Sequence, residues 1–270
     1  MLYWECFHTY QQFMDRHPIY LVTGPCGSGK TTWIHQQLTI STEPSAYICL
    51  GADATPIDLT YITATCPHVK PIAAGADWTQ LAEIQPLYVE IAPQLDLAKL
   101  QLPVDLESCQ RIAIVPKGLS ASEYHDWATQ TLISEVTENN VLLTASPRWG
   151  LTGEVLDPAS LNIFWDELIQ GAYGEVARAK GIFEIVDGRS FYFSFGVGFP
   201  DCTYFELPLP PVLTGRPTRF SGLEVVGNNL QPQLIMETLE DCGLDDNALA
   251  YYHEQIQSQL STESPEEVAV

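Results

Sequence analysis

Positive charge is the scarcest property of this chain of 270 residues. Lys and Arg together number 12 against 34 Asp and Glu, which gives a formal net charge of -22 at neutral pH. The stretch 220–270 contains neither Lys nor Arg. Because nucleic acids and anionic membranes are both bound through clustered basic side chains, we expect neither kind of partner. An anionic ligand needs a specific site that overcomes the surrounding negative field.

Long apolar runs and paired cysteines are also missing. No hydrophobic run reaches the ~18 residues that span a bilayer. The start of the chain lacks the basic and apolar regions of a signal peptide. The seven cysteines are scattered, so we expect reduced thiols and a cytoplasmic location. The six histidines are dispersed, and neither a zinc-hydrolase motif nor the G-x-S-x-G serine motif occurs.

What is present is a globular composition, with 46% hydrophobic residues. The first half alternates apolar runs with polar segments, which predicts βαβ units and a parallel sheet. The expected strands are 19–24, 46–51, 86–93, 111–118 and 139–146, with helices at 33–38, 79–85 and 122–137. The stretch 52–76 is rich in Thr, Pro and small residues, so we interpret it as a long irregular loop.

The pattern changes after Pro158 to an α+β, mainly antiparallel type. A helix is expected at 161–170, and a hairpin over 176–198 turns at Asp187-Gly188. A strand at 221–227 and a helix at 231–244 complete this half. We therefore expect three parts: a first domain at 1–157, a second at 158–244, and a helical extension with a disordered acidic tail at 245–270.

The strongest motif is G-x-x-x-x-G-K-[ST], which lies between an expected strand and an expected helix. Glycines let successive N–H groups curl around a phosphate, and a helix N-terminus adds its dipole. In such a P-loop the lysine reaches the β- and γ-phosphates and the following threonine ligates Mg²⁺. The residues expected to bind nucleotide phosphates are Gly24, Gly27, Ser28, Gly29, Lys30, Thr31 and Thr32. The open alternative is a former site that now only maintains the fold.

An acidic residue, Glu90, follows the apolar residues Leu-Tyr-Val in the third expected strand, 86–93. P-loop proteins hold Mg²⁺ with an acid at this position, usually through water. We therefore predict that Thr31 and Glu90 together form the magnesium site. The alternative is an exposed carboxylate with no such role.

The second half resembles the C-terminal domain of the CobW-type GTPases, a family described as metal chaperones. The resemblance rests on 173–183, which contains the segment RAKG, and on 223–230, which is followed by a helix ending at Asp241-Cys242. The order of motifs in the first half fits the same family. The resemblance implies an α/β fold, with a P-loop parallel-sheet domain and a smaller α+β domain. It also implies GTP-dependent metal handling, most plausibly of zinc, with delivery to a client protein.

Three of the family's motifs are altered in this chain. Cys66-Pro67-His68 stands where the family has clustered metal-binding cysteines. Pro93 replaces the glycine whose N–H contacts the γ-phosphate in the family. Proline has no N–H, so it cannot make this contact. Lys117 keeps the lysine of the guanine motif, but Leu119 replaces the aspartate that accepts hydrogen bonds from guanine.

These observations lead to one interpretation and one rival. The interpretation is a divergent CobW-like nucleotide-binding protein that uses GTP or ATP with Mg²⁺, with zinc implied by the family alone. Lys117 is expected to contribute to nucleotide binding. Glu90 and Asp58 are the candidate catalytic acids, and hydrolysis is expected to be slow or absent. The rival is a catalytically silent assembly or interaction factor that uses nucleotide only conformationally or not at all. The oligomeric state is left open.

Overall fold

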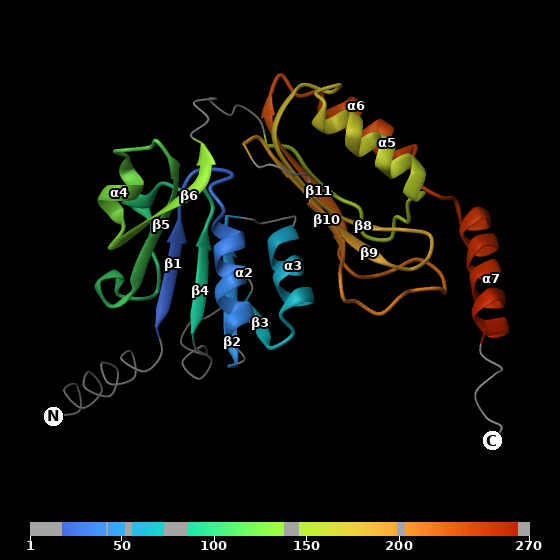
Figure 1. The fold of residues 1–270 in the computed structure, drawn as a ribbon, viewed down its shortest axis with the longest axis horizontal. Coiled ribbons are helices and arrows are strands. Elements are labelled where there is room, and N and C mark those ends of the chain that lie inside the picture. Colours follow the sequence, from blue (N-terminus) through green and yellow to red (C-terminus); the bar gives the residue numbers. More distant parts are fainter. Residues whose placement is uncertain are drawn as a thin grey trace. The chain divides into compact units, whose positions relative to one another are not determined.

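The computed structural model describes residues 18–41, 43–51, 56–72, 86–137, 146–198 and 203–263. The chain divides into two units, Met1–Asn140 and Val141–Val270 (Figure 1). Among the described helices, none is long and apolar enough to cross a membrane.

The first unit contains a six-stranded parallel sheet in the order β3-β2-β4-β1-β5-β6. Its strands are β1 (Ile19–Thr23), β2 (Ser45–Leu50), β3 (Val69–Pro71), β4 (Leu87–Ile91), β5 (Gln110–Lys117) and β6 (Gln130–Thr137). The chain crosses β1 when it passes from β4 to β5, so the strand order reverses there. Ligands of open α/β sheets bind outside the carboxyl ends of strands at such a point.

Helices cover both faces of this sheet. On one face lie α2 (Lys30–Ile40) and α3 (Ile57–Thr65), side by side in Figure 1, whose buried side chains pack with the strands. The other face is covered by α4 (Glu123–Trp127) and the short turns η2 (Leu97–Lys99) and η3 (Leu106–Ser108). Burial on both sides explains why β1 and β4 are almost continuously apolar in sequence.

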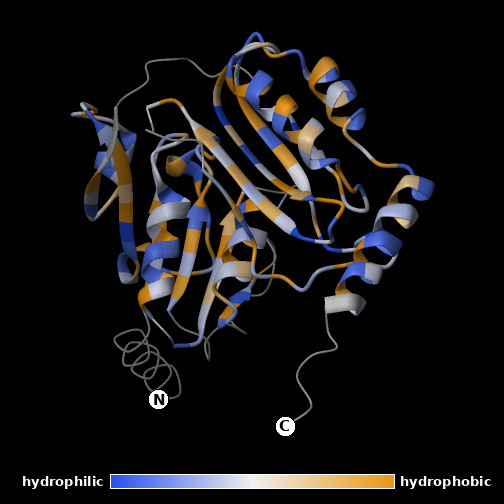
Figure 2. Cartoon of the chain, turned by 45° about the vertical axis from the view of Figure 1, so that its right-hand side comes forward, coloured by the Kyte–Doolittle hydropathy of each residue, from blue (hydrophilic) through white to orange (hydrophobic). Residues whose placement is uncertain are grey.

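The second unit contains a five-stranded antiparallel sheet in the order β10-β9-β8-β11-β7. Its strands are β7 (Arg148–Gly150), β8 (Glu175–Glu184), β9 (Ser190–Gly196), β10 (Thr203–Glu206) and β11 (Gly222–Asn228). Its helices are α5 (Pro158–Ile169), α6 (Pro232–Glu240) and α7 (Asp246–Glu263). In Figure 2, hydrophobic and hydrophilic residues alternate along strands of this sheet, as expected for a sheet with one face on the core.

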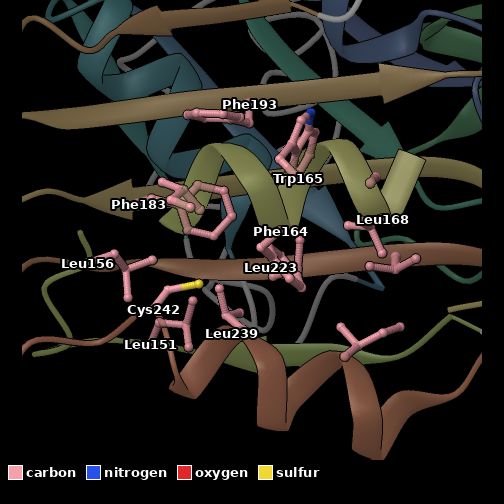
Figure 3. Close-up of a cluster of buried hydrophobic side chains, with 14 of the residues drawn as sticks. Leu151, Leu156, Phe164, Trp165, Leu168, Phe183, Phe193, Leu223, Leu239 and Cys242 are labelled. Carbon is pink, nitrogen blue, oxygen red and sulfur yellow. The ribbon is translucent and has the colours of Figure 1, made fainter. Parts of the chain in front are cut away.

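The core of the second unit lies between this sheet and the helices α5 and α6 (Figure 3). Trp165 of α5 packs edge-on against Phe193, with ring centroids 5.1 Å apart. Phe193 in turn packs edge-on against Phe183, at 5.3 Å. These rings come from one helix and two neighbouring strands, and they fix the helix on the sheet.

The expected architecture, a parallel α/β sheet followed by a mainly antiparallel α+β unit, is confirmed. The hairpin also forms as expected, since β8 and β9 are joined by a turn at Asp187-Gly188. Gly188 has a φ of 81° and donates its N–H to the carbonyl of Ile185 at 2.9 Å. The positive φ explains why glycine is needed at this turn.

The prediction of a long loop over 52–76 was wrong, because α3 and β3 lie within it. The Thr-rich sequence conceals a helix whose hydroxyls bond back to its own backbone. Thr63 donates to the carbonyl of Leu59 at 2.9 Å, and Thr65 donates to that of Tyr61 at 2.7 Å. The polar side chains are thereby satisfied within the helix, which makes it compatible with a partly buried position.

The predicted helix over 122–137 was also wrong beyond its first turns. Helix α4 ends at Trp127, and residues 130–137 form β6, which pairs with β5. The β-branched residues in this stretch favour a strand. The strand expected at 139–146 and the helix expected at 79–85 lie almost wholly or wholly outside the described residues.

The domain division falls earlier than the predicted boundary at 157. Strand β7 pairs with β11, which makes residues 148–150 part of the second sheet. Residues 245–263 belong to the same unit rather than to a separate extension. Arg216 anchors α7 by donating to Asp246 at 2.8 Å and to the carbonyl of Leu244 at 2.7 Å. The first three residues of the predicted disordered tail, 261–263, are helical.

Candidate functional site

The P-loop connects β1 to α2 at the carboxyl end of the central strand. Gly24, Gly27 and Gly29 have φ values of 144°, 76° and 93°, conformations that side chains rarely adopt. A Cβ at Gly24 would lie 2.0 Å from the carbonyl oxygen of Ile114 in β5. The motif therefore needs glycine for two reasons, a left-handed backbone and close approach to the neighbouring strand.

Lys30 is the first residue of α2 and is 6% exposed. Its Nζ donates to the carbonyl oxygens of Gly24 and Pro25, both at 3.0 Å. The loop thus curls around its own lysine. Gly29 precedes the helix and supplies no side-chain cap, so the first N–H groups of α2 are not capped by it. Uncapped N–H groups beside an ammonium form a site suited to an anion.

Two further P-loop positions differ in exposure. The hydroxyl of Ser28 is buried, with the residue 1% exposed, and has no hydrogen-bond partner within the described part of the chain. A buried polar atom without a partner is uncommon in folded proteins and is often explained by a ligand or water. Thr32, expected at the α-phosphate, is exposed on the surface of α2. Both placements fit a loop that binds phosphate.

Glu90 and Thr31 meet beneath the P-loop. The Thr31 hydroxyl donates to Oε1 of Glu90 at 3.1 Å. Both residues are buried, at 6% and 5% exposed, so the alternative of an exposed carboxylate at Glu90 does not hold. A hydroxyl and a carboxylate that face each other beside a phosphate-binding loop are the oxygen ligands that Mg²⁺ prefers. The residues present therefore fit Mg²⁺, which when bound would neutralise phosphate charge.

Tyr47 in β2 is a candidate site residue that sequence reasoning missed. It is fully buried, and its hydroxyl donates to Oε2 of Glu90 at 2.8 Å. Both oxygens of Glu90 therefore accept a hydrogen bond, one from Tyr47 and one from Thr31. A signal was available, because a tyrosine in an apolar strand usually needs a buried partner for its hydroxyl.

The electrostatics of this cluster favour a neutral Tyr47. Burial is the largest cause that raises the pKa of Tyr47 well above its ordinary value, and the charge of Glu90 is the next. Cys49 and Asp58 add to the same effect. Asp58 lies in the first turn of α3. Its charge is thus felt at the Tyr47 hydroxyl.

The turn after β4 is tied to the end of β2. The N–H of Ala92 donates to the carbonyl of Leu50 at 3.0 Å, and the Gln94 amide donates to that of Gly51 at 2.7 Å. Pro93 lies between them and has no N–H. The N–H of Ala92 is thus already engaged, and neither Ala92 nor Pro93 has a backbone N–H available to donate to a γ-phosphate.

The segment Pro116–Leu119 forms a tight turn at the end of β5. Gly118 has a φ of 107°, and the N–H of Leu119 donates to the carbonyl of Pro116 at 3.2 Å. Lys117 is exposed at the same edge of the sheet as the P-loop. Leu119, the residue at the position of the aspartate in the guanine motif that the sequence resembles, ends this turn and has an apolar side chain.

The motif Cys66-Pro67-His68 follows α3. Cys66 is buried, and its Sγ lies 3.9 Å from the Thr39 hydroxyl. Among the residues that the structure describes, no three His, Cys, Asp or Glu side chains gather where they could hold a metal ion. The described residues therefore do not fit a zinc centre.

We expect Gly24→Ala to destabilise the protein and to abolish phosphate binding. Its Cβ would collide with the Ile114 carbonyl, which cannot move without disturbing β5. Gly27→Ala is the matched control, because a Cβ there meets nothing within 4 Å. The control should lose only the roughly 1–2 kcal/mol of a left-handed alanine. Urea unfolding compares the two, and equal losses would contradict the predicted clash.

We also expect the free energy of unfolding to fall in alkali. Burial raises the pKa of Tyr88 to about 12, whereas an unfolded tyrosine titrates near ~10. The native state therefore keeps its proton where the unfolded chain loses it. The stabilisation is fully present below pH ~10 and is lost as the pH rises through about 12. Urea unfolding across this pH window should show that the free energy of unfolding falls less steeply with pH in Tyr88→Phe than in the wild type. Identical declines would refute the raised pKa of Tyr88.

Comparison with protein-family models and with curated protein sequences gives no match. Among solved structures, the chain is similar to the Zn(II)-bound YjiA GTPase from E. coli, with 13% identity and a TM-score of 0.31. The similarity covers 84% of this chain and 98% of that one. A Zn(II)-bound triple mutant of YjiA GTPase is similar over the same shares, with 12% identity and a TM-score of 0.31. TM-scores this low do not support a fold assignment by themselves. The assignment therefore rests on the strand order and register of the two sheets.

Proposed function

We propose that this chain is a CobW-like nucleotide-binding protein. The P-loop would bind the phosphates of GTP or ATP, and Thr31 and Glu90 would hold Mg²⁺. The observation that carries the proposal is the buried hydrogen bond between Thr31 and Glu90, 3.1 Å long. It joins the P-loop to an acid on the adjacent strand, which is the arrangement that magnesium-dependent nucleotide binding requires.

The CobW part of the proposal is supported by where its motifs lie. The RAKG segment is part of β8, and the segment from Leu223 to Gly227 is part of β11. These two strands pair directly, with Leu223 opposite Gly181 and Val225 opposite Ala179. The two stretches that resemble the family therefore form one continuous piece of sheet rather than two unrelated matches.

Base selectivity is expected to be poor. The guanine ring offers donors that a carboxylate normally accepts, and Leu119 has no acceptor to give. A site that lacks a hydrogen-bonding partner discriminates weakly between ligands. We therefore propose that GTP and ATP bind with similar affinity and that the phosphates supply most of the binding free energy.

Hydrolysis is expected to be slow or absent. Pro93 gives no N–H to the γ-phosphate, and the N–H of Ala92 is engaged by Leu50. This same observation favours the second candidate, a catalytically silent assembly factor in which nucleotide sets a conformation. Zinc handling would need ligands beyond the described residues, and is proposed only as an implication of the family.

The proposal is tested by titrating the purified chain with Mg·GTP and Mg·ATP and then following phosphate release. We expect both nucleotides to bind, with dissociation constants within about tenfold of each other, and release near the uncatalysed rate. Selective binding of GTP with rapid turnover would contradict the poor selectivity and the slow hydrolysis. If neither nucleotide binds, the second candidate, an interaction factor that does not use nucleotide, would be favoured. Metal content after purification without a tag tests zinc separately, because stoichiometric zinc would reveal a site outside the described residues.

A further inference from the structure

We infer that Tyr47 is a positioning residue for Glu90: it holds one carboxylate oxygen so that the other stays directed at Thr31 and at Mg²⁺ beside it. This inference rests on the proposed function, because it concerns the magnesium site of the same P-loop. It adds a specific residue from a third strand, β2, to a site otherwise built from the P-loop and β4.

The geometry comes from the register of the sheet. Within the pairing of β2 with β4, Tyr47 lies opposite Tyr88 and Cys49 lies opposite Glu90. The long side chain of Tyr47 therefore reaches forward to the carboxylate two positions further along, where its hydroxyl donates to Oε2 at 2.8 Å. Thr31 of α2 donates to the other oxygen, Oε1, at 3.1 Å. Donors from two separate elements fix the orientation of the carboxylate.

The contact between Tyr47 and Glu90 is shielded from water. Tyr47 is 0% exposed and Glu90 is 5% exposed. The Tyr47 hydroxyl donates to Oε2 of Glu90 at 2.8 Å. Removing this donor would cost the buried carboxylate oxygen a hydrogen bond that water cannot readily replace.

This arrangement keeps the Thr31 hydroxyl and Oε1 of Glu90 together. A threonine hydroxyl has one proton and two lone pairs, so it can donate to a carboxylate and ligate a metal ion at the same time. If Tyr47 did not occupy Oε2, the buried carboxylate would rotate to satisfy that oxygen elsewhere. The position of Oε1 would then depend on whether the ion is present.

The test uses the full chain and the variant Tyr47→Phe, which removes only the hydroxyl. Tyr88→Phe is the matched control, since Tyr88 is buried in the same hydrophobic cluster on the facing position of β4. Nucleotide affinity is measured in EDTA and then as a function of Mg²⁺ concentration. We expect Tyr47→Phe to raise the Mg²⁺ concentration for half-saturation about tenfold. Its affinity in EDTA should stay within about twofold, and Tyr88→Phe should match the wild type.

A thermodynamic cycle with Glu90→Gln separates positioning from packing. If Tyr47 acts through Glu90, then Tyr47→Phe should change the Mg²⁺ requirement little in the Glu90→Gln background. An effect of full size there would overturn the inference, as would an unchanged Mg²⁺ requirement in Tyr47→Phe alone. Equal weakening in EDTA and in Mg²⁺ would show a purely structural hydroxyl. A wild-type chain that binds no nucleotide would instead overturn the proposed function. Should Tyr47→Phe not fold, a normal Mg²⁺ requirement in Glu90→Gln alone would overturn the inference.

Discussion

Replacing Lys30 by alanine is expected to weaken nucleotide binding by roughly 10- to 150-fold, the range for losing a hydrogen bond to a charged group. In the free protein its ammonium is buried and donates to Gly24 and Pro25. These carbonyls hold the ammonium inside the curl of the loop, where a phosphate would sit. Isothermal titration calorimetry with Mg·ATP measures the loss directly.

The matched control for this variant is Lys99→Ala. It removes the same charge from the same unit, but the Lys99 side chain is 84% exposed and pairs with Asp96 on the surface. If a lysine acted only by reducing the negative potential of a chain of net charge -22, both substitutions would weaken nucleotide binding equally. We expect Lys99→Ala to bind within about twofold of the wild type. Equal losses in the two variants would mean that Lys30 acts only through net charge.

The largest effect on stability is expected from Arg219→Ala. Glu184 at the end of β8 is 1% exposed, and Arg219 binds both of its oxygens at 2.6 Å. Arg219 also donates to the carbonyls of Gly188 at 2.9 Å and Pro210 at 2.6 Å, which joins the hairpin turn to the segment that follows β10. Its removal leaves a buried carboxylate without its partner, so we expect a loss of about 3–5 kcal/mol in the free energy of unfolding. Urea denaturation provides the measurement.

Two further variants show whether the buried charge is the cause. Arg189 also pairs with two carboxylates, but its side chain is 42% exposed, so Arg189→Ala should cost less than about 1 kcal/mol. The double variant Glu184→Leu with Arg219→Met removes both charges and should recover much of the loss. A double variant as unstable as Arg219→Ala would indicate that the backbone contacts of Arg219, and not the charge of Glu184, dominate.

The sequence predicted the P-loop, the strand before it and the acid at Glu90 because each depends on a local sequence pattern. A glycine-rich loop between an apolar run and a helix is visible in a single stretch of chain. The hairpin at Asp187-Gly188 was predictable for the same reason, since the turn requires glycine at a positive φ. Local conformational requirements therefore account for most of what was foreseen.

The incorrect or missed predictions concern features that depend on contacts formed only in the folded chain. Helix α3 was hidden because Thr63 and Thr65 look like loop residues until their hydroxyls bond to the carbonyls one turn back. Strand β6 was mistaken for helix because its pairing with β5 is not visible in its own sequence. The bond between Tyr47 and Glu90 spans 43 positions, and only the alignment of β2 with β4 brings the two together.

The acidic composition of the chain and its phosphate-binding loop are compatible. A phosphate held in this P-loop would meet backbone N–H groups and the ammonium of Lys30, and no basic surface is required. Glu90 accepts a hydrogen bond from Thr31, and a divalent ion held by these two residues would offset the repulsion between the carboxylate and the phosphates. We therefore expect Mg²⁺ to tighten the binding of nucleotide.

The most direct measurement is calorimetric titration of the wild type and Lys30→Ala with a non-hydrolysable nucleoside triphosphate in the presence of Mg²⁺. The account predicts one site per chain in the wild type, tightened by Mg²⁺, with affinity at least roughly tenfold lower in Lys30→Ala. A wild-type chain that produces no binding heat and no nucleotide-dependent rise in melting temperature would contradict it. So would binding that is equally tight in Lys30→Ala, because the nucleotide would then lie elsewhere.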